Sequence, residues 1–175
     1  MKLSKVIAGC LLGAVLSTSA VAHDSWKKSV DLTVGQMDIK GETGINFGFD
    51  SRFEKNIIDG SYGALYLGAG VGMEFFEAPE TDALDDGFGG IFDIYPTISY
   101  NVADTDLSVN ALVGYSVGAF GGERFRGMTW GVGAEYKITD RWSLGVSYKL
   151  TDGDFDGIED NIDLKRTSAY FTRSF

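Results

Sequence analysis

The chain has a single cysteine and a single histidine among its 175 residues. Cys10 lies in an N-terminal apolar stretch that we expect to be removed on export, so the mature protein has no disulfide or thiol chemistry. His23 is expected to stand at the very start of the mature chain. Because only histidine titrates near neutral pH unaided, a Ser–His or His–Asp site is not expected, and no other residues suggest an enzyme.

Basic residues and long apolar runs are also scarce. Lysine and arginine number 15 against 25 aspartate and glutamate, which gives a formal net charge of −10. Nucleic-acid binding is therefore not expected, because affinity for polyphosphate comes from clustered lysine and arginine. After the N-terminal stretch, no segment approaches the roughly 20 apolar residues of a membrane-spanning helix.

Glycine and aromatic residues, by contrast, are abundant: the chain has 24 glycines together with 12 phenylalanines, 8 tyrosines and 3 tryptophans. This combination favours a fold with crowded small positions and an aromatic outer surface.

The N-terminus has the features of a secretory signal peptide. Lys2 and Lys5 precede an apolar core, residues 6–16, and Ala20-Val21-Ala22 supplies the small residues that signal peptidase requires. We therefore expect a signal peptide over residues 1–22 and one mature domain over residues 23–175.

An alternative cleavage site begins at Ile7. The segment Ile7-Ala8-Gly9-Cys10 resembles a lipoprotein cleavage box, which would place a lipid on Cys10. Cleavage there would leave residues 11–16, most of the apolar core, on the mature protein, so we favour the first assignment.

The mature sequence alternates apolar with small or polar residues at a period of two, which predicts strands. In residues 65–75, for example, Leu67 and Val71 fall on one face, whereas Gly68 and Gly72 fall on the other. The pattern predicts about eight strands, near residues 30–34, 45–52, 65–75, 92–100, 107–118, 128–138, 142–150 and 165–175. We interpret the fold as all-β, a transmembrane antiparallel up-and-down barrel.

Connections of two kinds support a barrel in the outer membrane. Residues 101–106 and 139–141 predict short turns, whereas residues 76–90 and 151–163 predict longer acidic loops. A soluble periplasmic barrel with an apolar interior would show the same alternation and remains an alternative. The polar face favours the membrane barrel, because it is rich in glycine and serine, which suit a narrow lumen.

The C-terminal residues carry a family resemblance. The chain ends in Ala169-Tyr170-Phe171-Thr172-Arg173-Ser174-Phe175, with a terminal phenylalanine and alternating residues before it. This resembles the signature by which outer-membrane barrels are recognised for assembly, although Arg173 stands where an apolar residue is usual. The chain looks like the small barrels that include OmpX and the transmembrane domain of OmpA. The resemblance implies the outer membrane of a Gram-negative bacterium, and assembly-machinery contact through Phe175.

Charged residues on the polar faces are expected to lie inside the barrel. Both signs occur, so the charges can pair in a network that fills the lumen, since unpaired charges there would be costly. A gated or narrow pore is the functional alternative to this closed polar core. The expected network comprises Asp50, Arg52, Glu74, Asp93, Glu135, Lys137, Lys149 and Arg166.

An acidic segment near the C-terminus fits the calcium-loop template, with Gly157 at its sixth position. The candidate ligands are Asp152, Asp154, Asp156, Asp160 and Asp163. Glu159 at the eighth position and flanking strands argue against calcium, and a solvated loop without a cofactor is the alternative.

Arg124 and Arg126 could contact lipopolysaccharide phosphates as forked donors. We therefore hypothesise a non-enzymatic barrel with a structural or surface-interaction role and a closed lumen. A narrow porin-like channel for small solutes is the alternative. A soluble barrel that binds a hydrophobic ligand is a third.

Overall fold

The computed structural model describes residues 26–78, 87–120, 123–155 and 162–175. These residues form eight strands: β1 (Trp26–Ile39), β2 (Glu42–Gly60), β3 (Gly63–Ala78), β4 (Gly87–Val102), β5 (Leu107–Phe120), β6 (Glu123–Lys137), β7 (Trp142–Phe155) and β8 (Ile162–Ser174). Across these ranges the structure contains no helix long and apolar enough to cross a membrane. His23, Cys10 and the expected signal peptide lie outside the described residues.

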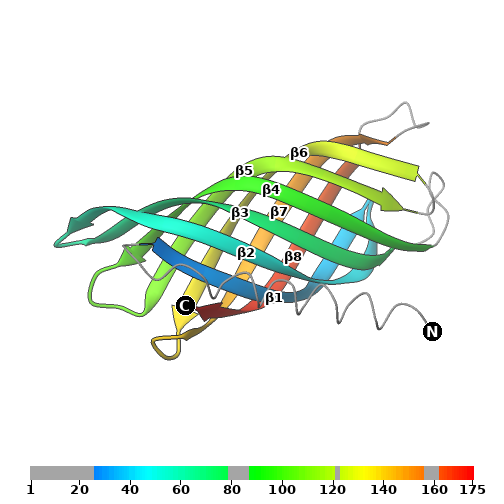
Figure 1. Ribbon diagram of the computed structural model, residues 1–175. Helices are drawn as coiled ribbons and strands as arrows, with labels where there is room; N and C mark the ends of the chain where they lie inside the picture. The colour runs from blue at the N-terminus through cyan, green and yellow to red at the C-terminus, as the bar shows by residue number, and fades with distance from the viewer. Residues whose placement is uncertain (1–25, 79–86, 121–122, 156–161) are drawn as a thin grey trace.

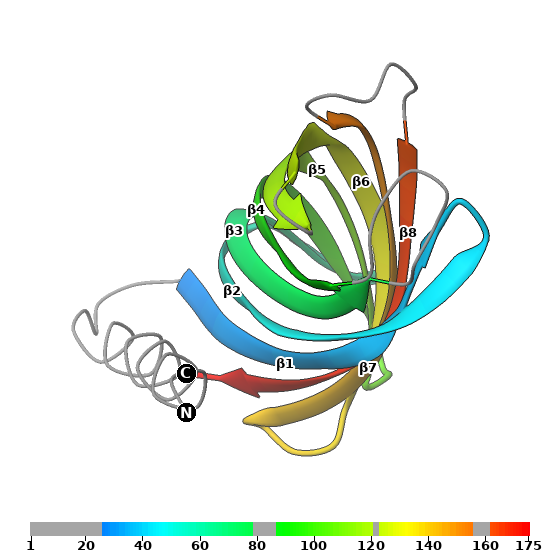
Figure 2. The same cartoon turned by 90° about the vertical axis from the view of Figure 1, so that its right-hand side faces the viewer.

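The strands close into a single barrel in which each pairs antiparallel with its neighbours in the sequence (Figures 1 and 2). The first and last strands complete the ring, from the Ser29–Ser174 pair to the Ile39–Leu164 pair. Closure removes both sheet edges, so the backbone groups of every strand can find partners. The prediction of an up-and-down barrel of about eight strands is confirmed.

The alternation of the sequence becomes the two faces of the barrel wall. On β4, the side chain of Asp93 is 1% exposed and points inward, whereas Ile94 is 55% exposed on the outside. Val146 on β7 repeats the outward pattern at 60% exposure. The apolar face is therefore the outer face, as a barrel in lipid requires, and the alternative of a soluble barrel with an apolar interior is wrong.

The two ends of the barrel differ. At the turn end, residues 61–62, 103–106 and 138–141 connect successive strands, and the chain finishes beside them (Figure 1). At the loop end, Lys40 and Gly41 make a tight turn with φ angles of 53° and 93°. The other loop-end connections, residues 79–86, 121–122 and 156–161, lie outside the described residues.

The strands extend further toward the loop end than the sequence analysis predicted. Phe76 and Glu77 were expected in a loop but belong to β3, where they pair with Gly89 and Phe88 of β4. Phe75 faces outward while Phe76 is fully buried, so two adjacent aromatic residues serve opposite faces. Because two apolar residues stand side by side, the alternation of apolar and polar residues is lost at this point. The predicted strand therefore stopped at residue 75, before its observed end.

Candidate functional site

The interior has space for large polar side chains because glycines stand beside them on the neighbouring strands: Gly70 pairs with Tyr95, and Gly145 pairs with Tyr170. A Cβ atom on Gly70 would lie 2.4 Å from the ring of Tyr95, and one on Gly145 would lie 2.2 Å from the ring of Tyr170. Any larger residue at these positions would displace the tyrosine rings from the lumen. The glycines of the polar face therefore make room for the interior groups.

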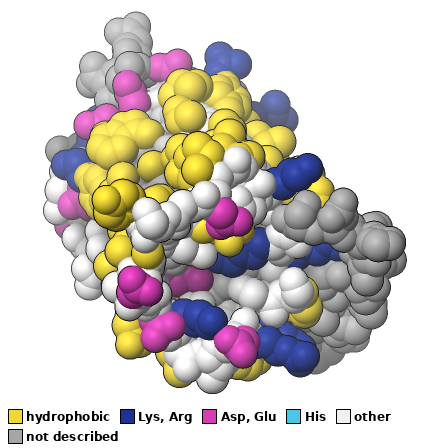
Figure 3. Space-filling model, turned by 90° about the vertical axis from the view of Figure 1, so that its left-hand side faces the viewer, with side chains coloured by type: hydrophobic (Ala, Val, Ile, Leu, Met, Phe, Trp, Pro, Cys, Tyr) yellow, Lys and Arg dark blue, Asp and Glu magenta, His cyan; other side chains and the backbone are white. Residues whose placement is uncertain are grey.

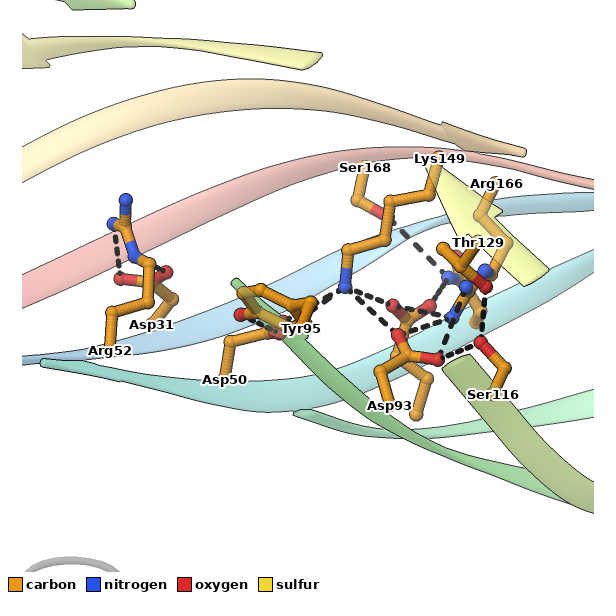
Figure 4. Close-up of polar contacts among 12 residues, drawn as sticks. Asp31, Asp50, Arg52, Asp93, Tyr95, Ser116, Thr129, Lys149, Arg166 and Ser168 are labelled. Atoms are coloured by element: carbon orange, nitrogen blue, oxygen red, sulfur yellow. Dashed lines mark hydrogen bonds and ion pairs between the residues drawn. The ribbon is translucent and has the colours of Figure 1, made fainter. Parts of the chain in front are cut away.

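Lys149 on β7 lies at the centre of the interior and contacts three carboxylates (Figure 4). Its Nζ atom is 3.0 Å from Glu74, 3.2 Å from Asp50 and 3.3 Å from Asp93. These three acids come from β2, β3 and β4, on the far side of the ring from β7. The ammonium group therefore ties opposite walls of the barrel together.

Arg166 on β8 shares two of these carboxylates. Its Nη1 atom donates to Glu74 at 3.1 Å and to Asp93 at 2.9 Å, and its Nη2 atom donates to Thr151 at 2.9 Å. Two cations thus face three carboxylates, all almost fully buried. Buried charges are tolerated only when they are paired and hydrogen-bonded. Every charged group of this cluster is paired, and among its ionic atoms only Arg166 Nε lacks a hydrogen bond.

Neutral groups satisfy the remaining oxygens of the cluster. The Tyr95 hydroxyl donates to Asp50, the Asn46 amide donates to Glu74 and the Ser116 hydroxyl donates to Asp93, each at 2.6 Å. Ser116 in turn contacts Thr129, which lies 2.7 Å from Thr151. We call this set, centred on Lys149 and Arg166, the central network.

A second group lies nearer the turn end. Arg52 on β2 binds Asp31 of β1 and Glu135 of β6, each at 3.0 Å. Figure 4 shows Arg52 and Asp31 separated from the central network along the barrel. A cavity of about 30 Å³ lies between the two groups, with Arg52, Lys149 and Tyr170 among its lining residues. This volume has room for about one or two water molecules.

Apolar side chains fill the interior at the loop end. We call this set the apolar cluster: Met37, Ile39, Phe76, Ile91, Phe120, Phe125 and Leu164, each at most 2% exposed. The ring centroids of Phe76 and Phe120 are 4.4 Å apart, and Phe125 meets Phe120 edge-on at 5.9 Å. Polar and apolar layers therefore follow one another along the lumen.

Seven of the eight charges expected in the lumen lie inside the barrel, within the two groups described above. Lys137 is the exception, because it ends β6 with its side chain 49% exposed and pairs with Asp140 at 2.8 Å. It lines an open recess of about 340 Å³ at the turn end, together with Lys27 and Glu135.

The sequence analysis missed two interior acids, Asp31 and Glu54. Asp31 alternates with Val30 and Leu32, and Glu54 continues the polar face of Asp50 and Arg52. Both could have been found by extending the period of two along β1 and β2. Ser99 donates a hydrogen bond to Glu54.

The candidate calcium ligands are distributed over two strands and an undescribed connection. Asp152 and Asp154 lie on β7 and Asp163 on β8, with exposed side chains, and Asp152 pairs with Asp163 in the sheet register. Asp156 and Asp160 lie outside the described residues. In the described part of the chain, no three His, Cys, Asp or Glu residues are grouped to hold a metal ion.

The expected lipopolysaccharide contacts lie on the outer wall near the loop end. Arg124 and Arg126 are exposed on β6, and Arg126 stands opposite Asp154 of β7 in the register. At the opposite end, Phe175 is 48% exposed and donates its backbone N–H to Lys28 at 2.9 Å.

Comparisons with known proteins agree with this architecture. The sequence matches the family described as "Outer membrane protein beta-barrel domain" over residues 8–175. A search of curated proteins finds no match.

Solved structures of the same shape include bacterial surface proteins and an enzyme. The outer membrane enzyme PagL has a TM-score of 0.62 at 18% identity, over 83% of this chain and 98% of that one. The attachment invasion locus protein Ail of Yersinia pestis, in complex with the heparin analogue sucrose octasulfate, scores 0.55 at 11% identity, over 87% and 100%. Neisserial surface protein A scores 0.53 at 13%, over 87% and 98%. At these identities the likeness establishes the fold alone.

Proposed function

Because this chain belongs to the outer membrane protein β-barrel family, and so lies in the outer membrane of a Gram-negative bacterium, we propose that it is a non-enzymatic barrel with a closed interior. Its role is structural or one of surface interaction. The observation that carries the proposal is the succession of two barriers along the lumen. Ions would have to pass both the paired charges of the central network and the desolvated apolar cluster.

The orientation follows from the connections. Barrels of this kind have short turns on the periplasmic side and longer loops outside, and the two longest connections of this barrel, residues 79–86 and 156–161, are both at the loop end. The turn end therefore faces the periplasm, and the apolar cluster lies at the external mouth. The recess at the turn end opens toward the periplasm and ends at the charged groups of the interior.

The chemistry of the interior supports a non-enzymatic role. None of the described residues is a histidine, and the carboxylates of the central network are each bound by a cation. Carboxylates held in this way are poor general bases, since their lone pairs are already engaged. PagL shares the fold at 18% identity, which does not carry its activity to this chain.

Lipopolysaccharide is the proposed partner of the outer wall. Arg124 and Arg126 point outward on β6 near the external end, where lipid phosphates would lie. A guanidinium group presents paired donors that match a phosphate. Arg124→Gln with Arg126→Gln should lower the lipopolysaccharide that remains bound on purification, whereas Lys55→Gln at the periplasmic end should not. Equal retention in both variants would reject this contact.

Phe175 is the proposed contact for the barrel-assembly machinery. Its ring is half exposed at the end of the last strand, where an assembly factor could reach it. Deleting Phe175 should lower the fraction of chains that reach the folded state in cells, with unassembled chain accumulating in the periplasm. Unchanged assembly would remove this role.

Conductance of the purified barrel in a planar lipid bilayer tests the closed interior. We expect no steady openings in symmetrical potassium chloride. The matched control is the double variant Phe120→Ala with Arg166→Ala, which weakens both barriers and should conduct once it is shown to fold. Steady openings of the unmodified barrel would contradict the proposal and favour a narrow channel for small solutes.

A further inference from the structure

A groove of about 510 Å³ lies on the outer wall at the turn end, outside the lumen. It is lined by Asp140, Arg141, Arg173, Ser174 and Phe175. Figure 3 faces this end of the molecule and shows lysine and arginine side chains, with acidic ones among them, beside hydrophobic ones. Phe175 is also the proposed assembly contact, whereas Asp140, Arg141, Arg173 and Ser174 have no part in the proposed function.

Strand pairing brings the two arginines of the groove together. The backbone N–H of Ser174 donates to the carbonyl of Arg141 at 2.9 Å, which fastens the β6–β7 turn to the last strand. Arg173 immediately precedes Ser174 on that strand and pairs with Trp142 in the register. Two guanidinium groups from distant parts of the sequence are therefore held on one small surface.

The acidic side chain in the groove does not neutralise the positive charge of the two arginines. Asp140 forms an ion pair with Lys137 at 2.8 Å, and the hydrogen bond from Lys137 lowers the pKa of the Asp140 carboxyl. Asp140 is the one acidic side chain among the lining residues, and Lys137 already pairs with it, so the side chains of the groove carry an excess of positive charge. This local excess of positive charge stands out in a chain whose net charge is −10.

Two aromatic rings contact the guanidinium group of Arg173. Its guanidinium carbon lies 4.9 Å from the ring centroid of Phe175 and 5.4 Å from that of Trp142. Trp142 in turn stacks on Phe171 with centroids 4.8 Å apart. Tryptophan at the end of an apolar outer face marks the boundary between lipid and water, so the groove lies at headgroup level.

We propose that this groove binds the phosphate group of an anionic phospholipid in the periplasmic leaflet. The turn end faces the periplasm, so the lipids of that leaflet are the molecules in reach. The printed contacts of the Arg173 side chain are with these two rings, which leaves its N–H groups available to a phosphate, and Arg141 supplies a second donor fork. The same contacts explain why an arginine is accommodated at position 173 of an otherwise alternating C-terminal segment.

The test uses the purified full-length barrel in detergent with an equimolar mixture of phosphatidylglycerol and phosphatidylcholine of the same acyl chains. Bound lipids are counted by native mass spectrometry. The unmodified barrel should retain phosphatidylglycerol in preference to phosphatidylcholine. Arg141→Gln with Arg173→Gln should lower phosphatidylglycerol retention by roughly tenfold, as expected for two lost charge-assisted contacts. The Arg173→Lys variant should retain an intermediate amount of phosphatidylglycerol, less than the unmodified barrel and more than the double variant. An ammonium group keeps the positive charge but lacks the paired donors of a guanidinium group.

The matched control is Lys40→Gln with Lys165→Gln, which removes two exposed cations at the opposite end. It should retain phosphatidylglycerol as the unmodified barrel does. The mobility difference between boiled and unboiled samples on a gel reports whether each variant has folded. If the double arginine variant does not fold, Arg141→Gln alone, in an exposed turn, replaces it and should still reduce retention.

Three results would overturn the proposal. One is undiminished phosphatidylglycerol binding in the folded arginine variants. Another is an equal loss in the lysine control, which would mean that overall charge governs binding. The third is a fall in the amount of assembled barrel in cells with lipid retention unchanged, which would assign these arginines to assembly.

Discussion

Arg166 on β8 binds Asp93 on β4 through both of its terminal nitrogens, at distances of 2.9 and 3.3 Å. The two strands lie four apart in a ring of eight, so this forked contact spans the width of the barrel. It joins residues 73 positions apart in the sequence. The lumen is therefore narrow enough for side chains from opposite walls to meet. Mutation of Arg166 tests how much this contact stabilises the barrel.

Replacing Arg166 by methionine should destabilise the barrel strongly. Glu74 and Asp93 would then share Lys149 with Asp50, which leaves buried carboxylates short of partners. The expected loss is about 3–5 kcal/mol of unfolding free energy. Urea titration of the barrel folded in lipid vesicles measures it. Lys165→Met, one residue away but exposed, is the control, and an equal loss there would refute the role given to the network.

Adding a methyl group at Gly70 should also destabilise the barrel. The new Cβ would collide with the ring of Tyr95, whose hydroxyl binds Asp50. We expect Gly70→Ala to cost about 1–3 kcal/mol, the range of an overpacked core. At Gly90 the nearest atom to a new Cβ is 3.6 Å away, so Gly90→Ala should be tolerated. The same urea titration compares Gly70→Ala with Gly90→Ala. Similar unfolding midpoints would mean that Tyr95 can move to accommodate the added methyl group.

Truncating Phe76 tests the apolar cluster. Its ring is fully buried against Phe120, so Phe76→Ala should cost about 3–5 kcal/mol. Phe88→Ala removes the same atoms from a ring that is 50% exposed on the outer wall, and should cost less. A larger loss at Phe88 would show that lipid-facing contacts, and not the interior, hold the external end together.

Calcium should leave the thermal stability of the barrel unchanged. Asp152 and Asp154 stand on a paired strand, in contrast to a loop that can fold round an ion, and Asp154 lies opposite Arg126. Melting temperatures in calcium and in chelator should therefore agree, for the unmodified chain and for Asp154→Asn alike. If calcium raised the melting temperature and Asp154→Asn abolished that rise, the hypothesis of a calcium site would be supported.

Local patterns predicted the faces of this barrel well, because a strand has a fixed period of two. Asp50, Glu74 and Lys149 could be placed inside from their alternation with apolar neighbours alone. Lys137 has the same inward phase, but it ends its strand where the barrel opens to water. There it reaches Asp140 in the following turn instead of the central network.

Two features could not be predicted from the sequence: contacts that depend on the alignment of neighbouring strands, and the apolar packing inside one end of the barrel. The Arg52–Asp31 pair requires β1 and β2 to be aligned as observed, and no local pattern specifies that alignment. The apolar cluster was missed for a different reason. Its members break the small-and-polar character expected of inward positions, so Phe76 was interpreted as a loop residue.

The central network draws its charged groups from β2, β3, β4, β7 and β8, and the ring is completed by β1 against β8. Lys149 and Arg166 reach carboxylates on β2, β3 and β4 across the closed ring, so we expect these contacts to be incomplete until the last strand docks. Partly closed rings therefore lack the main polar contacts of the finished barrel. We expect folding and unfolding to be highly cooperative, with a slow closing step set by contacts distant in the sequence.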